Sequence, residues 1–261
     1  MKTGVDQLFR KRIGISQNET IRFEMLDQVL EKTAFTIPFE NTNIIFGNSY
    51  KISKEGLINK ILLKNEGGLC YEINPIFYFF LLENGFNVRL VRGVVYNQQP
   101  QRWSPTGRTH IAILLMHNNQ NYLIDTGFGV NLPLKPVPLA GQIIESAIGE
   151  FRIVPVKNEF GDYILEIKLH NKDSDWKIGY CFDSNKPVND LSELDEIRQI
   201  ISVHPDSSFN KHPLMTKNKN NGHITLTDSS FTQYMKGETI KDVIDEETFK
   251  GIAKKHFSLE I

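Results

Sequence analysis

A cysteine preceded by two glycines is the residue of this sequence with the clearest chemical potential. Cys70 lies in the run Gly67-Gly68-Leu69-Cys70-Tyr71-Glu72-Ile73-Asn74, just before an apolar segment, 73–82, for which we expect a helix. The N-terminus of a helix carries partial positive charge and unpaired backbone N–H groups, and both favour a thiolate over a thiol. Because the thiolate is the nucleophilic form, this position predicts a reactive cysteine.

A histidine and an aspartate follow at the ends of two apolar segments. His110 opens the segment 110–116, and Asp125 follows the segment 122–124. A nucleophile, a base that activates it and a group that orients the base together make up an activated nucleophile. Each residue also fits a structural role, since free cysteines are frequently buried and aspartate favours turns. The ordered set of Cys70, His110 and Asp125 nevertheless predicts a catalytic triad.

Several motifs, in the same order along nearly the whole chain, resemble the arylamine N-acetyltransferase family. The similar segments are Ile37-Pro38-Phe39-Glu40-Asn41, Gly67 to Asn74, Thr109-His110, Asp125-Thr126-Gly127-Phe128-Gly129, Ser202-Val203-His204-Pro205-Asp206-Ser207 and Ile224-Thr225-Leu226-Thr227. The resemblance implies an enzyme that acetylates arylamines and hydrazines. It would take the acetyl group from acetyl-CoA, pass it through an acetyl-cysteine by a ping-pong mechanism and act in xenobiotic metabolism.

The resemblance also implies roles for individual residues. Cys70 would be the nucleophile, His110 the acid and base, and Asp125 the group that orients His110. Phe39, Phe128 and Phe209 would line the acceptor pocket, while Gly127 and Gly129 would let the backbone approach the acetyl group or the pantetheine arm closely. Asn74 lies four residues after Cys70 on the same helix face and would brace the triad or bond a turn.

One position departs from the family pattern. The family usually carries arginine immediately before the glycine pair, where this chain has Glu66. We expect Glu66 to lie close to Glu40. Because two neighbouring carboxylates disfavour joint ionisation, either another cation such as Arg108 or Lys64 compensates them, or the local packing differs from that of the family. Two alternatives therefore stay open: a cysteine hydrolase or transglutaminase-like acyl transferase, and a catalytically weakened CoA-binding homologue.

Composition excludes several other classes of protein. The 261 residues carry a formal charge of −1 and no long basic patch, which argues against nucleic-acid and membrane partners. No apolar run approaches the roughly 20 residues that span a bilayer, and residues 1–6 lack the apolar core of a signal peptide. With only two cysteines, the chain fits a reducing cytoplasm. We expect no metal, because His204, His212 and His223 are not accompanied by a metal-binding motif.

The hydrophobic pattern changes twice along the chain. Apolar residues recur at helical spacing through 21–35, 57–64 and 73–82, and β-rich segments follow at 88–96, 110–116, 122–124, 151–156, 163–169 and 176–182. An amphipathic helix at 191–203, a mobile polar loop at 210–222, a strand at 224–226 and a helix from Asp245 complete the prediction. Lys217, Lys219 and Arg108 are candidate ligands of the CoA phosphates.

The predicted class is α+β, in three parts. Residues 1–86 would form a helical bundle that carries the nucleophile, and residues 87–189 a β-barrel that carries His110 and Asp125. Residues 190–261 would form an interdomain helix and an α/β lid. The resemblance implies this division and places a triad like that of cysteine proteases between the first two parts.

Overall fold

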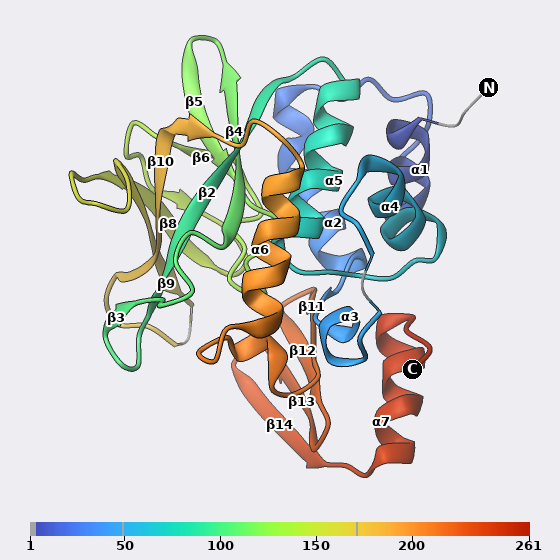
Figure 1. Ribbon diagram of the computed structural model, residues 1–261. Helices are drawn as coiled ribbons and strands as arrows, with labels where there is room; N and C mark the ends of the chain where they lie inside the picture. The colour runs from blue at the N-terminus through green and yellow to red at the C-terminus, as the bar shows by residue number, and fades with distance from the viewer. Residues whose placement is uncertain (1–3, 49, 171) are drawn as a thin grey trace.

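The computed structural model describes residues 4–48, 50–170 and 172–261. Residues 1–3, part of the segment inspected for a signal peptide, lie outside the described residues. A bundle of helices packs beside a β-barrel, and a second sheet lies below both of them in the view of Figure 1. This arrangement confirms the predicted α+β class.

The helical part contains the helix that begins at the reactive cysteine. Its elements are α1 (Val5–Ile13), η1 (Phe23–Met25), α2 (Leu26–Thr36), α3 (Thr42–Ile45), α4 (Lys54–Leu57), η2 (Ile58–Leu63) and α5 (Cys70–Glu83). The helix predicted from residue 73 thus starts at Cys70. Ser53 caps α4, since its side chain accepts a hydrogen bond from the Gly56 N–H. Ten residues of α5 are buried, so the helix runs through the core of this part.

An almost closed barrel of antiparallel strands forms the second part. Its strand order is β6-β5-β4-β2-β10-β9-β8-β7, with the short β3 paired to β2. The bounds are β2 (Asn87–Asn97), β3 (Arg102–Trp103), β4 (His110–His117), β5 (Gln120–Ile124), β6 (Val137–Pro138), β7 (Ile144–Glu145), β8 (Gly149–Pro155), β9 (Tyr163–Leu169) and β10 (Lys177–Pro187). The predicted strands are confirmed.

The turn between β4 and β5 fixes where His110 and Asp125 lie. Asn118 and Asn119, both with positive φ, form a two-residue hairpin loop. Paired left-handed residues match the twist of a hairpin, and asparagine tolerates that conformation. The register places Ile113 opposite Ile124, so the start of β4 and the end of β5 lie at the same end of the barrel.

The C-terminal sheet corrects one prediction. Its strands follow the order β1-β11-β12-β13-β14, with bounds β1 (Phe39–Glu40), β11 (Leu214–Lys219), β12 (Gly222–Thr227), β13 (Ser230–Met235) and β14 (Glu238–Val243). The expectation of a loop throughout 210–222 is wrong, because residues 214–219 form β11 and Gly222 begins β12. The polar residues of β11 find backbone partners in β1 and β12, which composition alone does not reveal.

The remaining helical segments pack against the helical bundle, the barrel and the C-terminal sheet. Helix α6 (Ser192–Val203) crosses in front of the boundary between barrel and bundle (Figure 1) and buries Leu194, Ile197 and Ile201 in the core that also holds α5. The short η3 (Ser208–Asn210) follows it, and α7 (Glu246–Ile252) with η4 (Ala253–Phe257) packs on the C-terminal sheet. Asp245 caps α7, since its side chain accepts a hydrogen bond from the Thr248 N–H.

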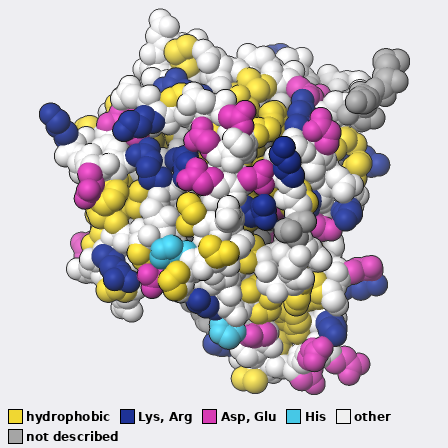
Figure 2. Space-filling view, viewed as in Figure 1, with side chains coloured by type: hydrophobic (Ala, Val, Ile, Leu, Met, Phe, Trp, Pro, Cys, Tyr) yellow, Lys and Arg dark blue, Asp and Glu magenta, His cyan; other side chains and the backbone are white. Residues whose placement is uncertain are grey.

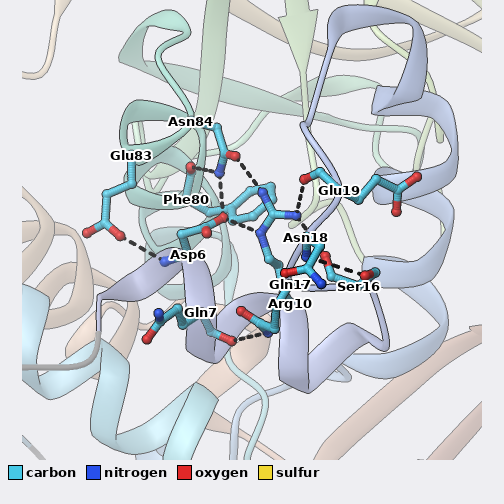
Figure 3. A network of polar contacts seen from close by, with 10 residues as sticks. All are labelled: Asp6, Gln7, Arg10, Ser16, Gln17, Asn18, Glu19, Phe80, Glu83 and Asn84. Carbon is cyan, nitrogen blue, oxygen red and sulfur yellow. Dashed lines mark hydrogen bonds and ion pairs between the residues drawn. The ribbon is translucent and has the colours of Figure 1, made fainter.

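A buried arginine joins the first helix to the end of α5. The Arg10 guanidinium bonds to Asp6, to the backbone carbonyls of Ser16 and Glu19, and to Asn84 (Figure 3). Asn84 in turn donates to Asp6. Charge-assisted bonds of this kind stabilise a buried cation well. This network therefore fixes the C-terminal end of α5, which is the end opposite Cys70.

The molecular surface carries charges of both signs. Lys and Arg side chains alternate with Asp and Glu over the face shown in Figure 2. Among the described residues, no helix is both long and apolar enough to span a membrane.

A buried lysine compensates two carboxylates behind the nucleophile loop, which we define as residues 65–69, just before Cys70. The Nζ atom of Lys60 lies 3.0 Å from Glu40 and 2.7 Å from Glu72, and all three side chains are at most 5% exposed. Glu72 also accepts hydrogen bonds from Tyr50 and from the Leu69 N–H. Of the cations considered for Glu66 and Glu40, Arg108 bonds instead to carbonyls of the barrel, at Phe160 and Arg92. Lys64 lowers the pKa of Glu66, as does the buried Lys60, which is not among the expected cations.

We expect Lys60→Met to lower the free energy of unfolding by about 3–5 kcal/mol, because it leaves two buried carboxylates without a cation. Urea denaturation measures the change. The control is Lys54→Met, which removes an exposed ion pair with Glu83 and should cost no more than about 1 kcal/mol. Equal effects of the two substitutions would contradict the analysis.

Candidate active site

The structure brings Cys70, His110 and Asp125 together where the helical part meets the barrel. Cys70 is the first residue of α5, His110 is the first residue of β4, and Asp125 directly follows β5. The three residues are 7%, 3% and 2% exposed. The Cys70 Sγ atom lies 3.6 Å from the Thr109 carbonyl oxygen, beside His110. The three residues, which lie far apart in the sequence, therefore form one compact group in the structure.

Asp125 holds the imidazole of His110 from one side. The His110 Nε2 atom lies 2.7 Å from Asp125 Oδ2, which leaves Nδ1 on the opposite side of the ring. The Tyr180 hydroxyl donates to the same carboxylate oxygen at 2.9 Å, and the Tyr180 ring packs on the imidazole with centroids 4.3 Å apart. Sequence reasoning missed Tyr180, because a tyrosine in a β-strand carries no signal of such a role.

Asn74 ties the cysteine-bearing helix to the aspartate. Its Nδ2 donates to Asp125 Oδ1 at 2.9 Å and to the Ile111 carbonyl at 2.6 Å. Its Oδ1 accepts from both the N–H and the hydroxyl of Thr126. The side chain is fully buried, so every one of these bonds is made away from water. The bracing interpretation of Asn74 agrees with these contacts.

Glycines permit the close approach of the loops around Cys70. A Cβ atom on Gly127 would lie 2.7 Å from the Cys70 Cα, and a Cβ on Gly67 would lie 2.0 Å from the Pro38 carbonyl oxygen. The Gly127 N–H also donates to Asp125. Gly127 therefore packs against the cysteine itself, whereas Gly129, with φ of +64°, lines the neighbouring cleft.

The electrostatics of the site favour a charged histidine. Burial by itself lowers the pKa of His110, but Asp125 and Cys70 both raise it, and the net pKa is about 10. An imidazolium with Asp125 on one side is the partner that stabilises a thiolate on the other. The group therefore has the features of an activated thiol nucleophile.

The nucleophile loop carries one unfavourable charge. Burial raises the pKa of the Glu66 carboxyl, Lys60 and Lys64 lower it, and Glu40 and Glu72 raise it, with a net increase. The expected closeness of Glu66 to Glu40 is consistent with this influence. The Glu66 backbone N–H donates to the Lys60 carbonyl, so the residue sits beside the buried lysine.

A cleft of about 660 Å³ opens next to the three residues. Four of the five residues predicted to contact substrate line it: Phe39, Phe128, Gly129 and Phe209. Phe39 pairs with Gly68 of the nucleophile loop, and the Phe128 ring centroid lies 5.1 Å from that of His110. The cleft wall thus reaches His110 through the Phe128 ring, and the aromatic rings in that wall suit a flat aromatic ligand.

Two of the predicted phosphate ligands have other partners. Lys217 donates to the His256 carbonyl and lies over the Phe257 ring, and Arg108 bonds to two backbone carbonyls of the barrel. Neither residue lines the cleft. Within residues 4–48, 50–170 and 172–261, no cluster of His, Cys, Asp and Glu has the arrangement of a metal site.

Comparison with known proteins agrees with this geometry. Residues 22–261 match the family model described as N-acetyltransferase. The chain is 38% identical to an uncharacterised acetyltransferase of Bacillus subtilis, over 92% of this chain and 93% of that protein. It is 34% identical to a probable arylamine N-acetyltransferase of Dictyostelium discoideum, over 86% and 81% of the two chains.

Solved structures show the same fold. An arylamine N-acetyltransferase from Bacillus cereus, described as having a Cys-His-Glu catalytic triad, is 40% identical, with a TM-score of 0.94 over 99% of this chain and 100% of that one. The enzyme from Salmonella typhimurium is 26% identical, with a TM-score of 0.87 over 99% and 92%. Fold and site thus define an acyltransferase. The chain belongs to the arylamine N-acetyltransferase family.

We expect Asp125→Asn to narrow the pH range in which Cys70 is reactive. Loss of the carboxylate lowers the pKa of His110, which in the native protein stays protonated until the pH approaches about 10. Alkylation by iodoacetamide between pH 6 and 8 should therefore be slower in the variant than in the native protein, because a neutral imidazole no longer stabilises the thiolate.

The matched control is Asp228→Asn, which alters an exposed aspartate paired with His212. It should leave the alkylation profile unchanged. A profile for Asp125→Asn that coincides with that of the native protein would show that Asp125 does not support the charge on His110.

We expect Glu66→Gln to stabilise the protein at pH 7 and to have no effect near pH 4. The pKa of Glu66 is raised in the folded state. Its ionisation therefore destabilises the fold once the pH rises above the pKa that Glu66 has in the unfolded chain. Thermal melts at both pH values measure the difference in Tm. Glu55→Gln, at an exposed site on α4, serves as the control. A Tm at pH 7 that is lower for Glu66→Gln than for the native protein would contradict the prediction that ionised Glu66 destabilises the fold.

Proposed function

We propose that this protein transfers the acetyl group of acetyl-CoA to arylamines and hydrazines by a ping-pong mechanism through an acetyl group on Cys70. The observation that carries the proposal is the placement of a cysteine at a helix N-terminus beside a histidine held by a buried aspartate. Family membership supports acetyl transfer as the reaction. The aromatic wall of the adjoining cleft supports an aryl acceptor.

In the first half-reaction, the Cys70 thiolate attacks the carbonyl carbon of the acetyl thioester. A new S–C bond forms, and the carbonyl electrons move onto oxygen. When the tetrahedral intermediate collapses, the bond from carbon to the CoA sulfur breaks. The His110 imidazolium donates its proton to the departing CoA thiolate, so CoA leaves as a neutral thiol and His110 becomes neutral. The enzyme is left with an acetyl-cysteine.

In the second half-reaction, the amine nitrogen attacks the acetyl carbon. His110, now neutral, takes a proton from the nitrogen, and the bond between Cys70 sulfur and carbon breaks. The products are the N-acetylated amine and a Cys70 thiolate beside a His110 imidazolium. The starting ion pair is thereby restored. Asp125 stays ionised throughout and stabilises the imidazolium, as the carboxylate of a triad does.

The negative oxygen of each tetrahedral intermediate requires hydrogen-bond donors. Cys70 opens α5, so its backbone N–H lies among the first four of the helix, which have no intrahelical partner. The partial positive charge of the helix terminus acts in the same direction. We assign the Cys70 N–H as one donor of the oxyanion hole.

We expect Cys70→Ala to abolish acetyl transfer and to prevent acetylation of the protein by acetyl-CoA. After incubation of the native protein with acetyl-CoA, mass spectrometry should find one acetyl group on the peptide that contains Cys70. Addition of an arylamine should discharge it and give one equivalent of acetylated amine. Cys181→Ala, the matched control at a buried cysteine of β10, should behave like the native protein.

The same experiment separates the alternatives. Discharge of the acetyl group by water at the same rate with and without amine would indicate a hydrolase and overturn the transferase proposal. Binding of acetyl-CoA without acetylation, together with slow alkylation of Cys70, would indicate a CoA-binding homologue. Normal turnover by Cys70→Ala would overturn the mechanism.

A further inference from the structure

Two lysines of the C-terminal sheet point away from the cleft beside the active site. Lys217 and Lys219 are alternate residues of β11, so their side chains lie on the same face of the sheet. Thr216, the neighbour of Lys217, lines the cleft from the opposite face. Lys217 donates to the His256 carbonyl near the C-terminal end of η4 and lies over the Phe257 ring. The two lysines are therefore on the face that α7 and η4 cover (Figure 1).

This region also gathers basic side chains from two other elements. Arg12, near the end of α1, and Lys219 both lower the pKa of Lys217. Lys217, Lys219 and Lys255 together lower the pKa of His256 on η4. Charges shift a pKa in this way only over short distances. The five residues therefore lie close together, and we call them the basic cluster.

Among the described residues, no carboxylate compensates these charges. Burial and the two neighbouring cations lower the pKa of Lys217 to about 8, and no described Asp or Glu acts against them. The lowered pKa of His256 has the same kinds of cause, again without a described acidic group. Burial also lowers the pKa of Arg12, to about 10. Positive charge that is concentrated at one place without counter-charge favours the binding of an anion.

The cluster also offers hydrogen-bond donors that the described residues leave unused. The Nη1 and Nη2 atoms of Arg12 donate to Asn65, but its Nε atom is buried without a partner among the described residues. A buried donor of this kind is expected to meet water or an ion. An ammonium group has three N–H donors, so Lys217 keeps free donors beyond its bond to the His256 carbonyl. Charge and donors thus coincide at the cluster.

The surroundings of the cluster suit an ion more than an organic molecule. Arg12, Lys217 and Lys219 are partly exposed. They line neither the cleft beside the active site nor the cavity of about 560 Å³ between the start of the nucleophile loop and residues 258–261. Sites for organic ligands are typically cavities of about 300–1,000 Å³. A small oxyanion needs only a few convergent donors, which the cluster supplies.

We propose that the basic cluster binds a small inorganic oxyanion with two negative charges, of the phosphate or sulfate type, through Arg12, Lys217 and Lys219. The inference is independent of the proposed function, because none of the cluster residues lines the cleft. The Arg12 Nε atom donates its unused bond to the ion, and the ion offsets the charge of Lys217. Arg12 also holds Asn65, the first residue of the nucleophile loop, which has a φ of +61°. The ion therefore braces that loop from the side away from the cleft.

Calorimetric titration with sodium sulfate at constant ionic strength tests the site, because sulfate stays a dianion from pH 7 to pH 9. The ion binds to protonated Lys217, whose pKa without the ion is about 8. The Kd of the native protein should therefore rise about 10-fold between these pH values. Lys217→Arg keeps its positive charge throughout. Its Kd at pH 7 should be similar to that of the native protein, and it should change by less than about twofold up to pH 9.

Lys217→Met should weaken sulfate binding at pH 7 by about 10-fold or more, since it removes a charged donor. Lys241→Met is the matched control, because Lys241 is exposed on β14 and does not belong to the cluster. It should bind sulfate as the native protein does. The inference would be overturned by equal affinities of the native protein and Lys217→Met, by the absence of sulfate binding to the native protein, or by a native pH dependence in Lys217→Arg. The arginine variant decides the test even where Lys217→Met does not fold.

Discussion

The buried carboxylate of Asp125 is the group on which the arrangement of this site depends. Its two oxygens meet donors from four segments: Asn74 on α5, His110 on β4, Tyr180 on β10 and the Gly127 N–H. An ionised group with no exposure to water persists only where hydrogen bonds replace its hydration. The same bonds that stabilise the charge therefore fasten the cysteine-bearing helix to the barrel and orient the imidazole.

A second buried cluster supports the first from behind the nucleophile loop. Lys60 bridges Glu40 on β1 and Glu72 on α5, while the Glu72 side chain accepts from the Leu69 N–H just before Cys70. Glu40 also links this cluster to the C-terminal sheet, because β1 pairs with β11. The position of the cysteine is thus set by electrostatic constraints on both sides of the helix terminus, which leaves the sulfur little freedom to move.

Much of the fold was predictable because local patterns and tertiary packing agree. Asn118-Asn119 between two apolar segments marks a hairpin, and Ser53 and Asp245 mark helix starts. The error at 210–222 arose because four of the six residues of β11 are polar, and the strand owes its structure to pairing with β1 and β12. For the same reason the role of Lys60 was missed, since this residue is adjacent to Glu40 and Glu72 only in the folded chain.

The sequence by itself determined the kinds of chemistry available: one cysteine at a helix start, a histidine and an aspartate at strand ends, and the family to which they belong. It could do so because these signals depend on residue type and short spacing. Only the tertiary structure decided which groups support them, including Tyr180 on Asp125 and Lys60 behind the loop that precedes Cys70. Those contacts join residues far apart in sequence, and burial sets their energies, so no local pattern records them.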